Sequence, residues 1–210
     1  MPLAALPRRA AFCLVVSALG LLPAGCGGGA APPTFAPLRY TYLTKIKLDV
    51  ARVDIDDSWT PRGADRHVEF LAPTPPLDAL RHMAEDRLVP GGTSRRALFT
   101  IEDASIIQAG DGYRAIFAVG LDILNDDGQR LRGITAHATG THAISGGDPD
   151  TVRSDLYELT RKVMADMNVD FEFQIRKTLR RDLQTTSETA PPPAPVQTQE
   201  LGAPGTPPPP

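Results

Sequence analysis

Three strand-like runs separated by two tight turns, the third run rich in Thr and Ala, constrain the fold of this chain more than any other feature. The runs cover residues 97–108, 113–124 and 130–144, and each is long enough to form a strand. The sequence Gly-Asp-Gly separates the first two runs, and Asn-Asp-Asp-Gly separates the second from the third. Turns of this composition are typical of β-hairpins. Successive hairpins predict a three-stranded antiparallel meander.

A strand and a helix are predicted before the meander. Residues 46–55 alternate between apolar and polar side chains, but the alternation changes phase inside the run, which predicts a bulge near Ala51 and Arg52. Thr74 is predicted to cap a helix whose first turn contains two prolines. Apolar residues then recur at the three- and four-residue spacing of one helical face, at Leu77, Leu80, Met83, Ala84 and Leu88.

A second, longer helix is predicted after the meander. Asp148 is placed to cap it, Pro149 takes its first position, and apolar residues recur as far as Leu183. A straight helix over residues 149–183 would be about 52 Å long, whereas a domain of this size has a radius of gyration of about 15 Å. We therefore expect a kink at residues 168–170, the weakest helical stretch, or a C-terminal half that projects beyond the sheet.

This order of strand, helix, meander and long helix predicts a single α+β domain over residues 38–183. The expected architecture is a two-layer sandwich, in which both helices lie on one face of a four-stranded antiparallel sheet. Residues 184–210 contain nine prolines and no aromatic residue, so they are predicted to form a disordered tail that has no core of its own.

The first 25 residues predict an export signal. Arg8 and Arg9 precede an apolar run of thirteen residues at 10–22. A helix that spans a membrane needs about 20 apolar residues, so this run is too short to be one. A short positive region followed by a short apolar region is the pattern of a signal peptide, which is removed from the mature protein.

The residues that follow the apolar run indicate a lipid anchor. The sequence LPAGC at 22–26 resembles the bacterial lipobox, although Pro23 stands where Leu is usual. The resemblance implies cleavage before Cys26, a diacylglyceryl thioether on its sulfur and an acylated amino group, and several chains anchor a protein stably. Gly27 stands where an Asp would favour the inner membrane, so we expect the outer membrane, with the domain facing the periplasm. Residues 27–37 are predicted to be a flexible tether.

The cysteine content and the net charge exclude several functions. The two cysteines are Cys13, inside the signal, and Cys26. The mature domain therefore has no thiol for a disulfide, a metal site or a nucleophile. The net charge is −3 and there is no dense stripe of Lys and Arg, so the sequence predicts no binding to nucleic acid.

No motif in the sequence predicts catalysis, a cofactor or a metal. The acidic segment at 54–58 lacks the Gly and Glu that a calcium-binding EF-hand requires at fixed places. His137 and His142 are five residues apart on one predicted strand, so they should face opposite sides of the sheet. A nucleophile elbow, a Walker loop and a dinucleotide fingerprint are also missing. We therefore expect a protein that is not an enzyme.

Five side chains are candidates for contact with a partner. Trp59 lies on a predicted loop beside acidic residues, where it could meet a partner or fold back on the core. Arg176, Lys177, Arg180 and Arg181 form a basic cluster at the end of the last helix. Cations at that end complement the helix dipole, and they could also meet anionic lipid or an acidic partner.

Four segments of the chain resemble a family of small alphaproteobacterial lipoproteins. They are VDIDDSW, PLDALRHMAEDRLVPGG, RALFTIEDASII and MADMNVDFEFQIRKTLRRDL, and the resemblance spans nearly all of residues 38–183. It implies no functional residues, because no activity is assigned to that family. More loosely, the layout resembles the lipoproteins that assist envelope transporters, including the lipopolysaccharide-assembly plug and the auxiliary subunits of lipid-trafficking ABC systems.

The looser resemblance implies a non-catalytic lipoprotein that binds a partner protein or a lipid during envelope transport or assembly. Two alternatives remain open. The first is a structural lipoprotein that contacts the cell wall through residues 184–210. The second is a periplasmic hydrolase whose active site the sequence motifs do not reveal.

Overall fold

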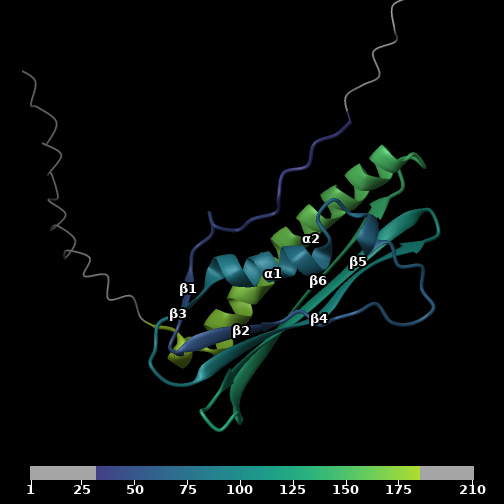
Figure 1. Cartoon of the computed structure of the whole chain (residues 1–210). Coiled ribbons are helices and arrows are strands. Elements are labelled where there is room, and N and C mark those ends of the chain that lie inside the picture. Colours follow the sequence, from purple (N-terminus) through teal and green to yellow (C-terminus); the bar gives the residue numbers. More distant parts are fainter. Residues whose placement is uncertain (1–31, 185–210) are drawn as a thin grey trace, which may run out of the picture. The chain divides into compact units, whose positions relative to one another are not determined.

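Four strands form the main sheet of the structure, a computed structural model that describes residues 32–184 (Figure 1). In their order across the sheet, the strands are β2 (Arg52–Asp56), β4 (Arg96–Ala109), β5 (Gly112–Leu124) and β6 (Arg130–Ala143). The pairs β4–β5 and β5–β6 are antiparallel, which confirms the predicted meander. Gly110 and Gly128 have φ angles of 61° and 81° in the two hairpin turns, a conformation that favours glycine.

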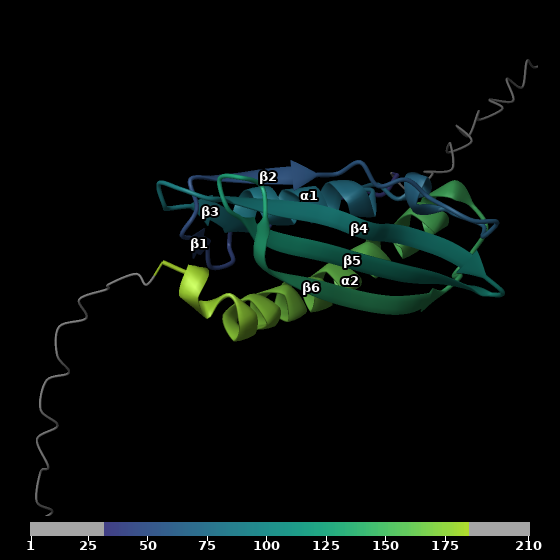
Figure 2. The same cartoon turned by 90° about the horizontal axis from the view of Figure 1, so that it is seen from below.

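Two helices pack against this sheet. The helix α1 (Pro76–Arg87) contacts β4, and α2 (Pro149–Thr178) contacts β5 and β6. Figure 2 shows both helices behind the strands, with the C-terminal half of α2 emerging past the β6 edge. The predicted α+β sandwich with two helices is therefore confirmed. Asp148 caps α2 as predicted, because its side chain accepts a hydrogen bond from the Thr151 amide at 2.9 Å. Thr74 is not a cap, since α1 begins after Pro75 without a side-chain cap.

The predicted first strand is divided between two sheets. Its first part, β1 (Ile46–Leu48), pairs in parallel with β3 (Leu88–Pro90) in a separate two-stranded sheet. Its second part, β2, pairs in parallel with β4, so the main sheet is mostly and not wholly antiparallel. The phase change near Ala51 is thus a break between strands, where a bulge was predicted. The parallel direction follows from the connection through α1, because a helical crossover returns the chain beside its starting strand in the same direction.

The C-terminal end of α2 packs against the small sheet. The helix runs without interruption through residues 168–170, and it ends at Thr178, earlier than predicted. A short 3₁₀ helix, η2 (Arg180–Asp182), follows it. Leu183 then forms an antiparallel bridge with Leu48 of β1. Although this half of α2 passes the β6 edge, Phe171 is buried in the common core and packs edge-to-face on Phe99, with ring centroids 5.7 Å apart.

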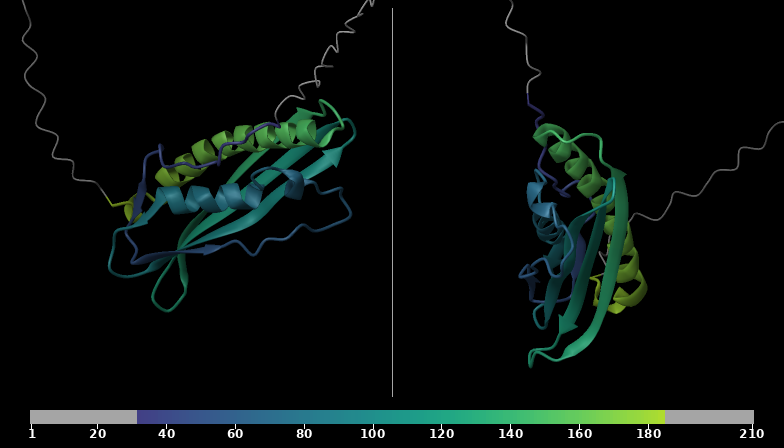
Figure 3. Two further views of the ribbon diagram at one scale, coloured as in Figure 1. Left: turned by 45° about the horizontal axis from the view of Figure 1, so that its top comes forward. Right: turned by 90° about the vertical axis from the view of Figure 1, so that its right-hand side faces the viewer.

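The end of the predicted tether is packed on α2. The ring centroids of Phe35 and Tyr157 are 5.1 Å apart, and the guanidinium of Arg153 lies 5.2 Å from the Phe35 ring centroid. The Tyr157 hydroxyl donates a hydrogen bond to the Ala36 carbonyl at 2.9 Å. Figure 3 shows the segment before β1 following the helices. The packed part of the chain therefore begins before residue 38. The predicted signal, Cys26 and residues 185–210 lie outside the described residues.

Candidate functional site

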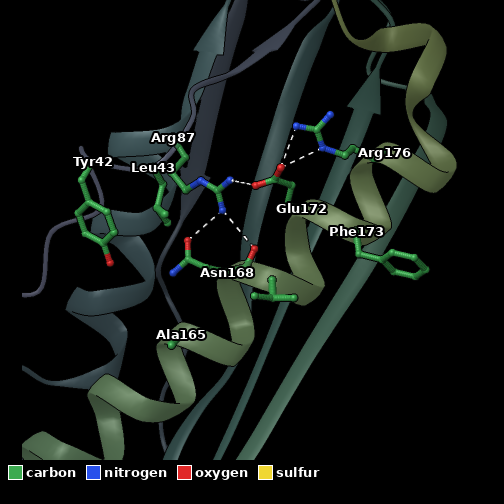
Figure 4. Close-up of a pocket in the computed structure, with 9 residues that line it drawn as sticks. Tyr42, Leu43, Arg87, Ala165, Asn168, Glu172, Phe173 and Arg176 are labelled. Atoms are coloured by element: carbon green, nitrogen blue, oxygen red, sulfur yellow. Dashed lines mark hydrogen bonds and ion pairs between the residues drawn. The ribbon is translucent and has the colours of Figure 1, made fainter. Parts of the chain in front are cut away.

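An open groove lies between α2 and the turn that precedes β1 (Figure 4). Its volume is about 490 Å³, which is within the size range of small-molecule sites. Nine residues from three separate segments line it, and we call it the α2 groove: Tyr42, Leu43, Arg87, Ala165, Asn168, Val169, Glu172, Phe173 and Arg176.

The rim of the α2 groove carries large apolar side chains in contact with water. Tyr42 is 77% exposed, Val169 is 72% exposed and Phe173 is 57% exposed. Exposing one apolar side chain is ordinary, but three around one hollow form a patch of the kind that marks interaction sites. The α2 groove is therefore the strongest candidate for a binding surface among residues 32–184.

The turn that carries Tyr42 is fixed to the end of α1. The buried Asp86 carboxylate accepts hydrogen bonds from the Tyr40 amide at 2.8 Å and from Arg39 Nε at 2.9 Å. The Leu43 amide donates to the Tyr40 carbonyl at 2.9 Å, which closes the turn. Burial acts to raise the pKa of Asp86, but the hydrogen bonds from Arg39 and Tyr40 outweigh it and hold the pKa below its ordinary value. Asp86 therefore stays ionised at neutral pH and holds the turn in place.

Arg87 forms the floor of the groove. It is the last residue of α1, and it is fully buried. Its Nη1 donates to the carbonyl of Asn168 at 3.2 Å and to the Asn168 side-chain oxygen at 3.0 Å, while Nη2 pairs with Glu172. Its Nε has no hydrogen-bond partner among the described residues. Figure 4 shows the guanidinium directed from α1 toward α2, so Arg87 ties the two helices together beneath the apolar rim.

Glu172 lies between two arginines. It pairs with Arg87 on one side, and Arg176 Nε donates to its other oxygen at 2.9 Å. Partial burial acts to raise the pKa of Glu172, but the hydrogen bonds and positive charges of Arg176 and Arg87 outweigh it, so the pKa is lowered. The ionised Glu172 carboxylate therefore stabilises the fold at neutral pH, and this stabilisation is lost as the pH falls through its lowered pKa. A carboxylate that is fixed and ionised in this way is poorly suited to donate a proton in catalysis.

A second hollow of about 270 Å³ adjoins the α2 groove and shares Glu172 and Arg176 with it. Its other walls are formed by residues 44–47, Ile175, Leu183 and Gln184. Gln184 is fixed there, because its amide donates to the Lys47 carbonyl at 3.0 Å. The two hollows together therefore extend along α2 as far as Leu183 and Gln184.

The structure does not bring the predicted contact residues together. Of the basic cluster, only Arg176 lines the α2 groove; Lys177 lies 5.8 Å from the ring centroid of Phe173, and Arg180 and Arg181 are exposed on η2. Trp59 is half-buried and lines a different hollow, beside β4 and β5. A role in partner contact stays a prediction for all five. No sequence pattern marks Tyr42, Val169 or Phe173 as a shared surface, because their exposure depends on how distant segments pack.

His67 lines the hollow beside Trp59 and lies next to the buried carboxylate of Glu69. His67 Nδ1 and Glu69 Oε1 are 3.3 Å apart, close enough for an ion pair when the histidine is protonated, but neither atom has a geometrically acceptable hydrogen bond. The other Glu69 oxygen accepts from the Ile106 amide at 3.2 Å. This carboxylate fastens the short helix η1 (Glu69–Leu71) to β4, so we interpret the pair as structural.

The acidic segment at 54–58 and the histidines of β6 form hydrogen bonds and ion pairs of a structural kind or are exposed. Asp56 accepts from the Ser58 amide at 3.1 Å, and Asp57 pairs with Arg81 at 3.2 Å. His142 lies 3.2 Å from Asp155 of α2, whereas His137 is exposed, as expected for opposite faces of β6. Across residues 32–184, no three or more His, Cys, Asp or Glu side chains are grouped to hold a metal ion. In the same range, no helix is long and apolar enough to cross a membrane.

Comparisons with known proteins identify no family. No family model matches the chain, and no curated protein matches it. Solved structures that match include a candidate lipoprotein from Caulobacter crescentus, with 10% identity and a TM-score of 0.36 over 60% of this chain and 88% of that one. A minor lipoprotein from Acinetobacter baumannii matches at 11% identity and a TM-score of 0.37, over 62% of this chain and 96% of the other.

A third match is a Xanthomonas campestris protein of the family DUF330, with 11% identity and a TM-score of 0.32 over 69% of this chain and 97% of that one. Of these three proteins, those from Caulobacter crescentus and Acinetobacter baumannii are described as lipoproteins. TM-scores at this level do not establish a common fold, so a function for this chain must be argued from its own residues.

Proposed function

We propose that this protein is a non-catalytic, membrane-anchored periplasmic lipoprotein that binds an apolar partner, a lipid or a protein of the envelope, in the α2 groove. Cys26 would carry the anchor, and Gly27 after it favours the outer membrane. In this role the protein would be an accessory in envelope transport or assembly.

One observation carries the proposal: Tyr42, Val169 and Phe173 expose large apolar surfaces around one hollow. Burying such surface against a partner is favourable by about 25 cal/mol for each Å² removed from water. The hydrogen bonds of Arg87 fix the groove in advance, so binding would order few additional side chains.

The polar groups of the groove support a binding role without catalysis. Arg87 donates to both Asn168 and Glu172, and the Asn168 side-chain amide donates to the Met164 carbonyl at 2.8 Å. A catalytic group must be able to exchange protons or form bonds with a substrate, whereas these groups are engaged in holding two helices together.

The proposal predicts that a photo-crosslinking amino acid at Val169 will form adducts in living cells. Phe70 is the matched control position, because it is 71% exposed, against 72% for Val169, but lies on η1 and does not line the groove. We expect lipid or protein adducts from position 169 that are missing from position 70. The substitution Phe173→Ser should reduce the yield at 169 several-fold. Equal adducts from both positions, or a yield that Phe173→Ser leaves unchanged, would contradict the proposal.

A further inference from the structure

We propose that the C-terminal half of α2 rests on the anionic surface of the membrane that holds the lipid anchor, with the apolar rim of the α2 groove inserted among the headgroups. This inference rests on the proposed anchoring through Cys26. The surface that covers the α2 groove is then a bilayer rich in anionic phospholipid, and this contact fixes how the domain is oriented on the membrane.

The exposed apolar residues suit the boundary between water and lipid. Tyr42 and Phe173 are aromatic, and aromatic side chains are favoured where headgroups meet acyl chains. Ala165, Val169 and Phe173 follow one another at four-residue steps along α2, so they form a short apolar strip on its exposed side. This strip is too short to span a bilayer, but it can lie in its surface.

The charges around this strip complement an anionic surface. Four basic side chains are exposed at the end of α2 and in η2: Arg176, Lys177, Arg180 and Arg181.

The acidic residues close to them are ion-paired or hydrogen-bonded, and the exposed Asp166 lies about 15 Å before Arg176 along α2. Glu172 is shared between Arg87 and Arg176. Asp182 is buried between Arg95 and Arg132, and Asp170 accepts from the His137 amide at 3.0 Å. The remaining exposed positive charge attracts anionic headgroups, and each basic residue near the surface strengthens association about fivefold.

The attachment of the tether is compatible with this orientation. Phe35 packs on Tyr157, so the chain enters the domain on α2 itself. Residues 27–34 can span at most about 28 Å when extended. Tyr157 and Phe173 are separated along the α2 axis by about 24 Å. An anchor at Cys26 therefore keeps the bilayer within reach of Phe173.

Tryptophan fluorescence in the full-length lipidated protein tests the inference. The chain has one tryptophan, Trp59, which lies in the hollow beside β4 and β5, away from the groove. The wild type is compared with Phe173→Trp in a Trp59→Phe background, both reconstituted in vesicles of phosphatidylglycerol with brominated acyl chains, which quench tryptophan on contact. We expect the fluorescence at position 173 to be quenched at least about twofold more than that of Trp59, because aromatic anchors sit at the acyl-chain boundary.

Two controls separate this surface from the lipid anchor, which all variants share. The difference in quenching between position 173 and Trp59 should shrink when brominated phosphatidylcholine replaces phosphatidylglycerol. It should also shrink when Lys177→Gln and Arg180→Gln are combined. Val169→Trp in the same background is a second reporter if Phe173→Trp does not fold. Quenching at 173 and 169 no greater than at Trp59 would overturn the inference. If crosslinking from Val169 still captured a specific protein in that case, the proposed function would stand with a protein as the occupant.

Discussion

Replacing Arg87 by alanine should lower the free energy of unfolding by about 2–3 kcal/mol, because it removes the hydrogen bonds of a buried guanidinium to Asn168 and to the partly exposed Glu172. Arg87 is fully buried, and its loss would leave the Asn168 side-chain oxygen and Glu172 without their partner from α1. The variant also opens a cavity where the guanidinium lay, which adds to the cost. Urea unfolding followed by circular dichroism measures the change.

Arg81 provides the matched control for this prediction. It belongs to the same helix, but it is partly exposed and its partners Asp57 and Asp78 are equally accessible. Such surface pairs contribute about 0–1 kcal/mol, so Arg81→Ala should change stability little. A loss for Arg87→Ala no larger than for Arg81→Ala would show that the buried network does not hold α1 against α2.

Replacing Asp182 by alanine should lower the free energy of unfolding by about 2–3 kcal/mol, because it removes two hydrogen bonds between charged groups. Its oxygens accept from Arg95 Nη1 at 2.7 Å and from Arg132 Nη1 at 2.8 Å. Arg95 has a φ of 66°, rare for a residue with a side chain, and its contacts with Asp182 and Asp49 hold it there. Thermal unfolding of the purified variant measures the loss.

The exposed Asp127 is the control for Asp182. It lies in the hairpin turn between β5 and β6, and its replacement by alanine should stay within about 0.5 kcal/mol. The Asp182 variant should also weaken the bridge between Leu183 and Leu48 of β1. Faster proteolysis near Leu183 would detect this. Wild-type stability and wild-type proteolysis in Asp182→Ala would contradict the role given to this carboxylate.

The meander was predictable because its signals are local. The two glycine turns and the apolar runs between them lie within about fifty residues, and each hairpin depends only on its own turn. The parallel pairing of β2 with β4 was not predictable in the same way. It depends on the return of the chain through α1, and nothing within residues 52–56 encodes the direction of a neighbouring strand.

The candidate site was mostly hidden in the sequence. Arg87 resembles any basic residue at a helix end, and only the packing of α1 on α2 reveals that it is buried. Tyr42 is 127 residues from Val169 in the chain (169 − 42), so no local pattern links them. The basic cluster was visible from the sequence, and the four-residue spacing of Phe173 and Lys177 on the predicted helix already places them side by side, but only the structure shows that Arg176 lines the groove.

According to the proposed function a partner covers the α2 groove in the cell, and hydroxyl-radical labelling of the wild-type protein in intact cells tests this. Phe173 and Phe70 are 57% and 71% exposed in the free domain, so with nothing bound their labelling should differ only slightly. We predict that Phe173 is labelled several-fold less than Phe70, because lipid or protein excludes water from the groove. Labelling of the two rings in proportion to their exposed fractions would contradict the claim.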